Sequence, residues 1–442
     1  MSSSDFIDLR INNAEQFVES ISEVSTNSKI YFAYGKCDAW ANDAVPGTAN
    51  SSIGTVYEIW SNMIGGKRLF GGDFHHVIPR YNWTSNTVYQ FYDHRTPDLH
   101  NSNSIFYVVN SAYSVYKCLS NNRGAVSSSE PTAVNPEATT TTGDSYIWKY
   151  MYTLSDVEQI RFMSDSYIPV KTLMADDGSQ QWQVQDQASD GAIHHIIVTS
   201  GGSNYSNVST ISIAISGDGS GAFASASINT TSNVITSITV TEPGLNYTYA
   251  TVTIADSGSG TSAAGVAIIS PPGGHGSNPL YELGGKNVMI NPRLKYSEGG
   301  ILPDTNDFRQ ICLIRDPYTY GNTSVASTSA FLQAYKITCD GTGNYNEDEL
   351  VYQGTSLAAA TFSGRVVSWD VSTSQLRIIN IRGTPSSFQS IIGSSSFTTR
   401  VITSVITNDL EPHSGRMLYV DNIVPVSRSS DQTEDFRILL KF

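Results

Sequence analysis

The chain has 442 residues and carries 26 Lys and Arg against 40 Asp and Glu, a formal net charge of −14. A negative field of this size repels phosphate groups, so the sequence predicts no direct binding of nucleic acid. Only 15% of the residues are charged, below the ~25% of ordinary globular chains, while 39% are hydrophobic. This composition excludes a disordered chain and favours short strands joined by polar turns, and the length predicts several domains.

Cysteine usage and the absence of targeting segments bear on where the chain folds. Cys37, Cys118, Cys312 and Cys339 lie far apart in sequence and form no C-x-x-C pair. Residues 1–10 lack the basic and apolar segments of a secretory signal, and no apolar run approaches the ~18 residues of a membrane span. The sequence therefore predicts free, mostly buried thiols, a reducing cytoplasm and no membrane insertion.

Residues 12–24 have the apolar spacing of an amphipathic helix. Ala14, Phe17, Val18 and Ile21 recur at positions i, i+3, i+4 and i+7. The sequence predicts that Asn13 caps this helix with Gln16 as the capping-box partner, and that the apolar stripe faces the core.

A second helix is predicted over residues 55–66. Its apolar stripe consists of Val56, Ile59, Trp60, Met63 and Ile64. Thr55 with Glu58 fits a capping box, and the pair Gly65-Gly66 predicts the end of the helix.

Most of the remaining sequence predicts strands. They are runs of β-branched or aromatic residues bounded by Gly, Asn, Ser or Pro. These runs are residues 30–34, 104–109, 114–119, 146–154, 309–314, 415–422 and 436–442. Between two of them, residues 120–145 are rich in Ser, Thr and Pro and predict a long loop or linker.

Residues 190–272 are almost free of charge and contain a repeat. IIVTSGGSNYSNVSTISIAISGDGSG is followed by ITVTEPGLNYTYATVTIADSGSG, so Tyr205 corresponds to Tyr247 and Gly202 to Gly244. Each copy predicts a strand, a Gly-turn-Tyr, a strand, a Gly-Ser turn and a further strand, and duplicated units of this size usually bury a shared face. The segment 271–279 after them predicts a linker.

A second block runs from about 326 to 405. The stretch VYQGTSLAAATFSGRVVSWDVSTSQLRIINIRG contains three short alternating strands at regular spacing. That pattern predicts a small β-barrel or sandwich module.

Two glycine-rich segments superficially resemble phosphate-binding loops. They are GDGSG (217–221) and GSGTSAAG (258–265). A dinucleotide-binding loop follows a strand and opens a helix, whereas strands are predicted on both sides here. The sequence therefore favours turns over phosphate sites.

Metal and catalytic chemistry have little support in the sequence. The adjacent pairs His75-His76 and His194-His195 fall on predicted strands, where neighbours point to opposite faces and cannot easily chelate one ion. The acidic segment 340–349 lacks the order of a Ca²⁺ loop and favours a solvated hairpin, with a weak cation site at Asp340, Asn344 and Glu347 as the sharper hypothesis. No G-x-S-x-G elbow is present, and a hydrolase stays an open alternative.

Five stretches together resemble one known family. They are KIYFAYGKCDAW (29–40), GTVYEIWSNMIGGKRLFGGDFHHVIPRYNW (54–83), GDSYIWKYMYTLS (143–155), FRQICLIRDP (308–317) and EPHSGRMLYVDNIVPVSRSSDQTEDFRILLKF (411–442). In this order they resemble the baseplate wedge protein of T-even-type contractile-tailed phages, the gene-product-eight family. The last stretch is the most specific, because HSG, a strand, DQTE and a final strand follow one another.

The resemblance skips the repeat block and the second block, and so predicts how the chain is divided. The blocks resemble β-repeats of phage structural proteins and a β-module of marine-phage tail proteins, respectively. The predicted parts are 1–185 (N-terminal wedge core), 186–279 (inserted two-copy β-repeat domain), 280–325 (core continuation), 326–405 (inserted small β module) and 406–442 (C-terminal strands closing the core).

The resemblance implies a mainly β protein of several antiparallel β-sandwich-like domains, with few short helices and two inserted β modules. It implies a structural subunit of the virion's tail baseplate, formed in the host cytoplasm, that pairs as a homodimer and contacts other wedge proteins, with tail fibre components as further contacts. No catalytic residue, cofactor or metal ligand comes with it. A tail-fibre adhesin, or a glycan-binding role for 190–272 through Tyr and Asn near its turns, is the alternative.

Overall fold

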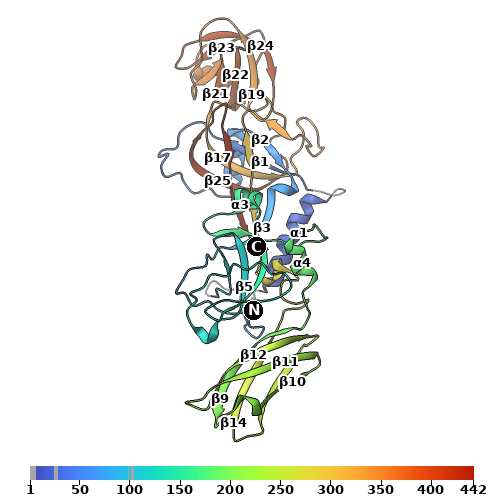
Figure 1. Ribbon diagram of the computed structural model, residues 1–442. Coiled ribbons are helices and arrows are strands. Elements are labelled where there is room, and N and C mark those ends of the chain that lie inside the picture. Colours follow the sequence, from blue (N-terminus) through green and yellow to red (C-terminus); the bar gives the residue numbers. More distant parts are fainter. Residues whose placement is uncertain (1–5, 24–27, 98, 101–103) are drawn as a thin grey trace. The chain divides into compact units, whose positions relative to one another are not determined.

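The structure is a computed structural model, and it describes residues 6–23, 28–97, 99–100 and 104–442. Within this part of the chain there are five α-helices and 27 strands, and the predicted mainly β fold is confirmed (Figure 1). The chain divides into two compact units. One comprises Met1–Glu15, His75–Met289 and Leu439–Phe442, and the other comprises Gln16–Phe74 and Ile290–Ile438.

A five-stranded antiparallel sheet forms the centre of the second unit. Its order is β18-β2-β1-β17-β25. The strands are β1 (Ile30–Gly35), β2 (Met63–Leu69), β17 (Asp307–Arg315), β18 (Ala330–Leu332) and β25 (Arg416–Ser427). Helix α2 (Ile53–Asn62) packs Ile59 and Trp60 against Ile314 and Phe331 of this sheet. The strands predicted at 30–34, 309–314 and 415–422 are thus confirmed.

The predicted caps and end of α2 are wrong. The hydroxyl of Ser52 caps the helix by accepting from the N–H of Thr55, and the helix ends at Asn62. Gly65 and Gly66 instead lie inside β2. Only glycine fits at residue 66, because a Cβ there would come 2.0 Å from the carbonyl oxygen of Phe32. The two glycines therefore permit a close approach between strands.

Helix α1 (Ile7–Ser22) begins five residues before the predicted segment. The predicted stripe is confirmed, with Ala14 and Ile21 buried, but Asn13 lies within the helix and cannot cap it. Ile7 and Ile11 extend the same 3.6-residue spacing towards the N-terminus, which explains the earlier start. Residue 24 of the predicted segment lies outside the described residues.

Two four-stranded sheets form the core of the first unit, with orders β4-β5-β7-β6 and β27-β15-β3-β8. The first consists of β4 (Tyr107–Val109), β5 (Ser114–Ser120), β6 (Thr140–Thr141) and β7 (Ile147–Thr153). The second consists of β3 (Phe74–Pro79), β8 (Tyr167–Pro169), β15 (Asn287–Ile290) and β27 (Ile438–Lys441). The short helices are α3 (Asp156–Phe162), α4 (Gln180–Asp186) and α5 (Pro279–Glu282). The second unit also holds a two-stranded sheet, β16 (Arg293–Lys295) with β26 (Thr433–Asp435).

The loop between β5 and β7 joins strands of one sheet and is not a linker between domains. A carboxylate oxygen of Asp144 accepts from the hydroxyl of Ser127 and from the backbone N–H groups of Ser128 and Ser129. Burial raises the pKa of Asp144, but hydrogen bonds from Thr142 and these serines outweigh it and lower the pKa to about 2. The loop is therefore held by polar contacts rather than by a core of its own.

The repeat block forms one six-stranded antiparallel sheet of order β10-β13-β14-β9-β12-β11 (Figure 1). Its strands are β9 (Ile193–Ser203), β10 (Ile211–Gly217), β11 (Ser220–Asn229), β12 (Val234–Leu245), β13 (Ala250–Asp256) and β14 (Thr261–Ile269). Tyr205 and Tyr247 are both buried in its core, each after a left-handed glycine and a left-handed asparagine. The two copies thus contribute equivalent residues to one core.

The second block forms a closed barrel of order β19-β22-β21-β20-β23-β24 (Figure 1). Its strands are β19 (Tyr335–Asp340), β20 (Leu350–Gln353), β21 (Phe362–Asp370), β22 (Gln375–Gly383), β23 (Ser390–Gly393) and β24 (Thr399–Ile406). Inward-facing apolar residues such as Ile337, Val366 and Ile402 fill it. The predicted barrel or sandwich is a barrel.

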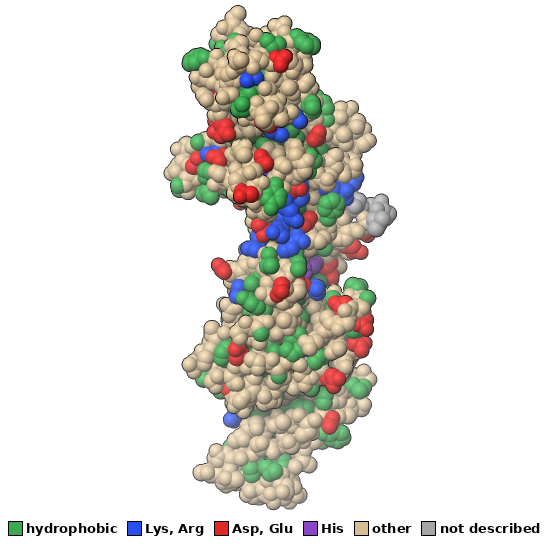
Figure 2. All heavy atoms as spheres, turned by 45° about the horizontal axis from the view of Figure 1, so that its top comes forward, with side chains coloured by type: hydrophobic (Ala, Val, Ile, Leu, Met, Phe, Trp, Pro, Cys, Tyr) green, Lys and Arg blue, Asp and Glu red, His purple; other side chains and the backbone are tan. Residues whose placement is uncertain are grey.

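The low charge of the chain is visible at its surface. On the face shown in Figure 2, uncharged side chains and backbone cover most of the area, and carboxylates are scattered.

All four cysteines are free and buried, which confirms the prediction of free, mostly buried thiols. Among the described residues no helix is long and apolar enough to cross a membrane.

Candidate functional site

The histidine pair on β3 is divided between separate contacts. His75 lies 3.5 Å from a carboxylate oxygen of Glu158, whereas His76 shares a hydrogen bond with the carbonyl oxygen of Gly285. Burial lowers the pKa of His76 to about 4, so its ring is neutral at pH 7. The two rings therefore do not form a joint chelate.

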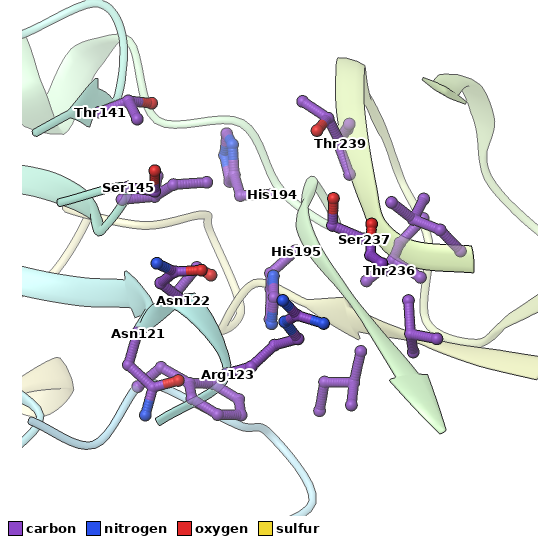
Figure 3. Close-up of a pocket in the computed structure, with 18 residues that line it drawn as sticks. Asn121, Asn122, Arg123, Thr141, Ser145, His194, His195, Thr236, Ser237 and Thr239 are labelled. Atoms are coloured by element: carbon purple, nitrogen blue, oxygen red, sulfur yellow. The ribbon is translucent and has the colours of Figure 1, made fainter. Parts of the chain in front are cut away.

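The second pair, on β9, lines a cleft in the first unit. The cleft has a volume of about 490 Å³ and lies between the β5–β7 region and strands β9 and β12. Figure 3 shows Asn121, Asn122 and Arg123 on one side and Thr236 and Ser237 on the facing strand, with the histidines between them. The cleft thus combines amides, hydroxyls and one guanidinium.

The two histidines of this cleft are neutral at pH 7. Burial, together with the charges of Lys149 and Lys117, lowers the pKa of His194 to about 4. Burial also lowers the pKa of His195 to about 4, and its ring packs edge-on against Phe91 at 5.2 Å. Arg123 is therefore the main cationic group of the cleft.

An ion pair is buried near this cleft. The Nζ of Lys117 lies 2.6 Å from Oε2 of Glu282, and the two side chains are 0% and 3% exposed. The other carboxylate oxygen accepts from the N–H of Gly276 at 2.7 Å. The ring of His275 is buried as well, and burial and nearby lysines hold its pKa well below the usual range.

These contacts correct one prediction. The segment 271–279 lacks regular structure before α5, as expected, but it is not an exposed linker. Gly274, His275 and Gly276 are buried, and the N–H of Gly276 donates to the carboxylate of Glu282. The only sequence feature of this contact is a glutamate six residues after a glycine, a pattern too common to predict a buried hydrogen bond.

Each glycine-rich segment lies at a turn between two strands and has a carboxylate beside or within it. Asp218 accepts from the N–H groups of Thr248 and Tyr249, and Asp256 accepts from those of Gly258 and Gly260. Hydrogen bonds from Thr248 lower the pKa of Asp218 to about 2. A carboxylate already occupies donors of the second segment, and Asp218 places a negative charge within the first, so both segments are unsuited to phosphate.

The acidic segment 340–349 was the candidate for a weak cation site, but the side-chain oxygen of Asn344 is engaged elsewhere. The side-chain oxygen of Asn344 accepts from the indole N–H of Trp369. Burial and the charges of Asp348 and Asp307 raise the pKa of Glu347. Throughout the described part of the chain, no three His, Cys, Asp or Glu side chains lie close enough to hold a metal.

Tyr205 and Tyr247 are unavailable for sugar stacking. Both are at least 96% buried, and the Cβ that an alanine would add at Gly260 or Gly219 would lie within 2.5 Å of their rings. Tyr249 is 61% exposed and is the one tyrosine near these turns that a ligand can reach.

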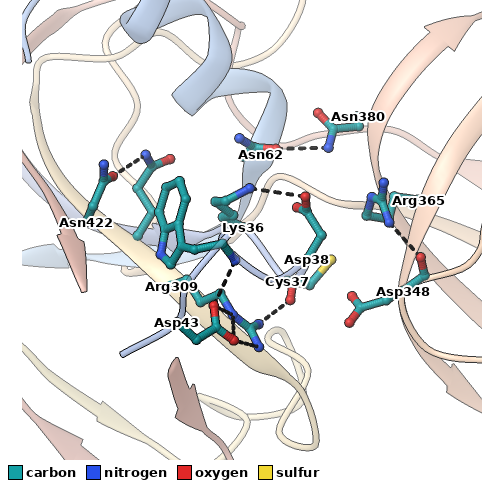
Figure 4. Close-up of polar contacts among 12 residues, drawn as sticks. Lys36, Cys37, Asp38, Asp43, Asn62, Arg309, Asp348, Arg365, Asn380 and Asn422 are labelled. Atoms are coloured by element: carbon teal, nitrogen blue, oxygen red, sulfur yellow. Dashed lines mark hydrogen bonds and ion pairs between the residues drawn. The ribbon is translucent and has the colours of Figure 1, made fainter. Parts of the chain in front are cut away.

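Polar contacts in the second unit fix the loop after β1, and no motif in the sequence pointed to them. The guanidinium of Arg309 donates to both carboxylate oxygens of Asp43 at 3.1 Å and to the carbonyl of Cys37 (Figure 4). Asn380 of the barrel donates to the side chain of Asn62 at 2.9 Å. Bidentate pairing of this kind fixes geometry and is not in itself a catalytic arrangement.

Comparison with known proteins gives one result. Residues 5–133 match the model of the Phage-Gp8 family, described as bacteriophage T4 Gp8, which implies a structural role in the baseplate wedge of the phage tail. A search of curated protein sequences found no significant match. Residues 5–133 are therefore similar to the Phage-Gp8 family, and the predicted resemblance is confirmed over that part of the chain.

Proposed function

We propose that this protein is a structural subunit of the baseplate wedge, which holds neighbouring wedge proteins in place for baseplate assembly and tail contraction. The observation that carries the proposal is the family match over residues 5–133. The sites that the sequence singled out serve local structure, since their carboxylates, histidines and glycines are engaged within the fold. Assembly takes place in the host cytoplasm under this proposal.

Strand pairing supports extending the family fold beyond the matched segment. The matched strands β1, β2, β3 and β5 pair with β17, β18, β8 and β7, respectively, all of which lie outside residues 5–133. A strand that loses such a neighbour exposes backbone groups and core side chains. We therefore propose that residues 134–185, 280–334 and 407–442 complete the wedge core, and that 186–279 and 335–406 are inserted modules. The second module begins later than the expected residue 326, because β18 belongs to the core sheet.

Electron cryo-microscopy of the virion tail tests the wedge assignment. We expect this chain in every wedge around the tail hub, in contact with other wedge proteins and with tail fibre components at the periphery. Density for the chain only at fibre tips would favour an adhesin, and its absence from the particle would contradict the proposal.

The homodimer is tested separately by sedimentation of the purified chain. A lasting subunit interface buries more than ~2,000 Å² and is rich in aromatic residues at its centre. Six Trp and 24 Tyr are available in this sequence. We expect a dimer at micromolar concentration, and a monomer across the micromolar range would contradict it.

Glycan binding at the cleft of Figure 3 is the second candidate function. The observation that favours it is the lining of amides, hydroxyls and Arg123 beside Phe91, groups that suit a polar or acidic sugar. A glycan array probed with the intact chain tests it. Hits that Arg123→Ala removes support this role, and an array without hits eliminates it.

A further inference from the structure

The cleft of Figure 3 is lined by strained backbone. Asn122 and Arg123 have left-handed φ values of 46° and 58°, and Gly124 follows them with a φ of 79°. Ser145, which also lines the cleft, has a φ of 64°. Residues with side chains adopt this conformation at an energetic cost and normally singly, and such strain gathers at ligand sites. The strained loop 122–124 therefore points to a binding role for this cleft.

Amide side chains hold the strained loop in place. The side chain of Asn121, which is 9% exposed, donates to the carbonyl oxygen of Tyr89 at 2.9 Å, and its own oxygen accepts from the N–H of Gly124 at 3.1 Å. The side chain of Asn122 donates to the carbonyl oxygen of Asp144 at 3.1 Å. Because the loop is tied to other parts of the first unit on both sides, the backbone of the arginine within it is fixed at the cleft.

The guanidinium of Arg123 has no partner within the described chain. It makes no hydrogen bond, ion pair or ring contact there, and the described residues that line the cleft include no Asp or Glu. A guanidinium is a planar cation with five N–H donors, and it binds a carboxylate through two parallel hydrogen bonds. The charged end of the cleft is therefore selective for an anionic group.

The imidazoles of His194 and His195 add unpaired nitrogens to the lining. Both residues are half-buried, and their rings make no hydrogen bond within the described chain. None of their nitrogens is among the polar atoms that the fold both buries and leaves unpaired, so a ligand can reach them. Figure 3 shows His195 on the Arg123 side of the cleft and His194 on the Ser145 side. A neutral imidazole offers one donor and one acceptor, which suits a hydroxyl group.

Hydroxyl groups and an aromatic ring complete the lining. The hydroxyls of Ser145, Ser237 and Thr239 also make no hydrogen bond within the part of the chain that the structure describes. Phe91 presents apolar surface, and the volume of about 490 Å³ lies within the ~300–1,000 Å³ of small-molecule pockets. One cation beside several unpaired neutral groups is the chemistry of a hydroxyl-rich ligand with one negative charge.

We propose that this cleft binds an acidic saccharide, with the carboxylate of the sugar on Arg123 and its hydroxyl groups on the histidines and hydroxyl side chains. One guanidinium balances the single charge of a carboxylate, whereas a phosphate monoester carries about −1.5 to −2 at pH 7. The C–H face of a sugar ring can pack on Phe91. This inference rests on glycan binding, the second candidate function, and it does not depend on the wedge function.

The test uses the intact chain with ¹³C-labelled histidine rings. The chain has eight histidines, so the signals of His194 and His195 can be followed by NMR and assigned with His194→Gln and His195→Gln. The probes are the methyl glycosides of glucuronic acid and galacturonic acid, each compared with its neutral glucoside or galactoside. We expect saturable shifts of these signals with a uronide, and binding of the neutral counterpart that is weaker by roughly tenfold or more.

Two results of this titration overturn the proposal. One is the absence of a saturable shift with both uronides, and the other is equal binding of the charged and neutral sugars. Acetate distinguishes a saccharide from a bare carboxylate. If acetate binds as tightly as the uronides, the cleft is a general carboxylate site and the saccharide is rejected.

Variants locate the charge that is recognised. Arg123→Gln should weaken uronide binding roughly tenfold or more and leave the binding of neutral sugars unchanged. The matched control is Arg382→Gln, because Arg382 is also exposed and unpaired within the described chain but lies in β22 of the barrel. Uronide binding that survives unchanged in Arg123→Gln contradicts the site. If that variant fails to fold, the charged and neutral probes on the unaltered chain decide.

The outcomes separate this inference from the proposed functions. Array hits confined to neutral glycans retain glycan binding and reject the acidic saccharide. An array without hits, together with no response to the uronides, rejects both. The place of the chain in the virion is decided by electron cryo-microscopy alone.

Discussion

The backbone N–H of Ser270 donates to the carbonyl oxygen of Ala192 at 2.9 Å, and the N–H of Ala192 donates to the hydroxyl of Ser270 at 3.1 Å. Both residues are at least 93% buried, and the whole six-stranded sheet lies between them in sequence. The block thus leaves and re-enters the rest of the first unit at one point. This relationship supports the proposal that the block is an insertion, since chains accept insertions where the two ends are close.

The first prediction concerns removal of this block. Replacing residues 193–269 by a short Gly-Asn turn is expected to leave a cooperatively folded chain, because Ala192 and Ser270 are already paired. Its melting temperature should fall, since Ile268 also packs in the core formed by residues such as Ile78 and Tyr107. Calorimetry measures both properties.

A second deletion serves as the control for the first. Removal of 310–314 takes out the centre of β17, which pairs with both β1 and β25, and should abolish folding. If the chain lacking 193–269 is insoluble or melts without cooperativity, the block is part of the fold and not an insertion.

The second prediction concerns the buried ion pair. Lys117→Met leaves the carboxylate of Glu282 buried without its cation, and the expected loss is ~3–5 kcal/mol of unfolding free energy. Adding Glu282→Gln should restore much of this loss, because an amide oxygen can still accept from the N–H of Gly276. Urea denaturation measures each variant.

An exposed pair provides the comparison for that prediction. Arg95 and Asp93 form a salt bridge at 2.8 Å, but the arginine side chain is 45% exposed. Arg95→Ala should therefore change the unfolding free energy by less than ~1 kcal/mol. A similar loss from both single variants would show that burial does not determine the cost.

The third prediction is a loss of stability in mild acid. His194 and His195 have pKa values of about 4 when folded, below the ordinary 6.5. From pH 6.5 down to about 4, the unfolded chain therefore binds protons that the folded chain does not, and stability falls as pH falls. Melting temperature measured between pH 7 and 4 should decrease over this window.

Substitution identifies the groups responsible for the acid effect. His194→Gln with His195→Gln should reduce the pH dependence between 6.5 and 4, and the remainder should come from His76 and His275, whose pKa values are lowered as well. The carboxylate of Asp144 serves as the contrast, because its pKa of about 2 lies below the ordinary 3.8. Its contribution is complete above that ordinary value and disappears only as pH falls further, so Asp144→Asn should leave the histidine window unchanged. An unaltered slope in the double histidine variant would contradict the assignment.

The fourth prediction concerns the glycine pair inside β2. Gly66→Ala places a Cβ 2.0 Å from the carbonyl oxygen of Phe32, and both groups are backbone-bound and cannot move aside cheaply. We expect a loss of at least ~3 kcal/mol or failure to fold. Gly47→Ala is the matched control, because nothing lies within 4 Å of the added Cβ. A folded, stable Gly66→Ala chain would show that β1 and β2 can separate.

The fifth prediction concerns two exposed aromatic residues of the barrel. Phe388 and Phe397 are 78% and 81% exposed, yet both have left-handed backbones, with φ of 60° and 55°. Such strain costs ~1–3 kcal/mol at a bulky residue, and asparagine tolerates this conformation better. Phe388→Asn and Phe397→Asn should therefore each stabilise the chain in urea denaturation.

The control for the aromatic variants is Tyr249→Asn. Tyr249 is 61% exposed but is not among the residues with a left-handed backbone, so the substitution should bring no gain in stability. If all three substitutions change the unfolding free energy equally, backbone strain at Phe388 and Phe397 does not lower the stability of the native chain.

The local elements were largely predictable because their signals are local. The aromatic and β-branched runs at β1, β5, β7 and β17 became strands at or near the predicted bounds. Where signals compete, prediction failed. Gly65-Gly66 has the chemistry of a helix end, but the approach of neighbouring strands decided its role. Asn13 has the chemistry of a cap, but apolar residues before it continued the helix.

The evidence for function likewise comes partly from the sequence and partly from the tertiary structure. Ordered motifs along the chain predicted the resemblance to the family by themselves, because they need no knowledge of contacts, and the match over residues 5–133 agrees with that prediction. Only the tertiary structure brought Arg123 and His195 together in one cleft, and only it buried His275 beside the pair of Lys117 and Glu282. The physical reason is that spacing along the chain encodes the periodicity of each element, whereas burial and the pairing of polar groups depend on residues brought together from distant parts of the sequence.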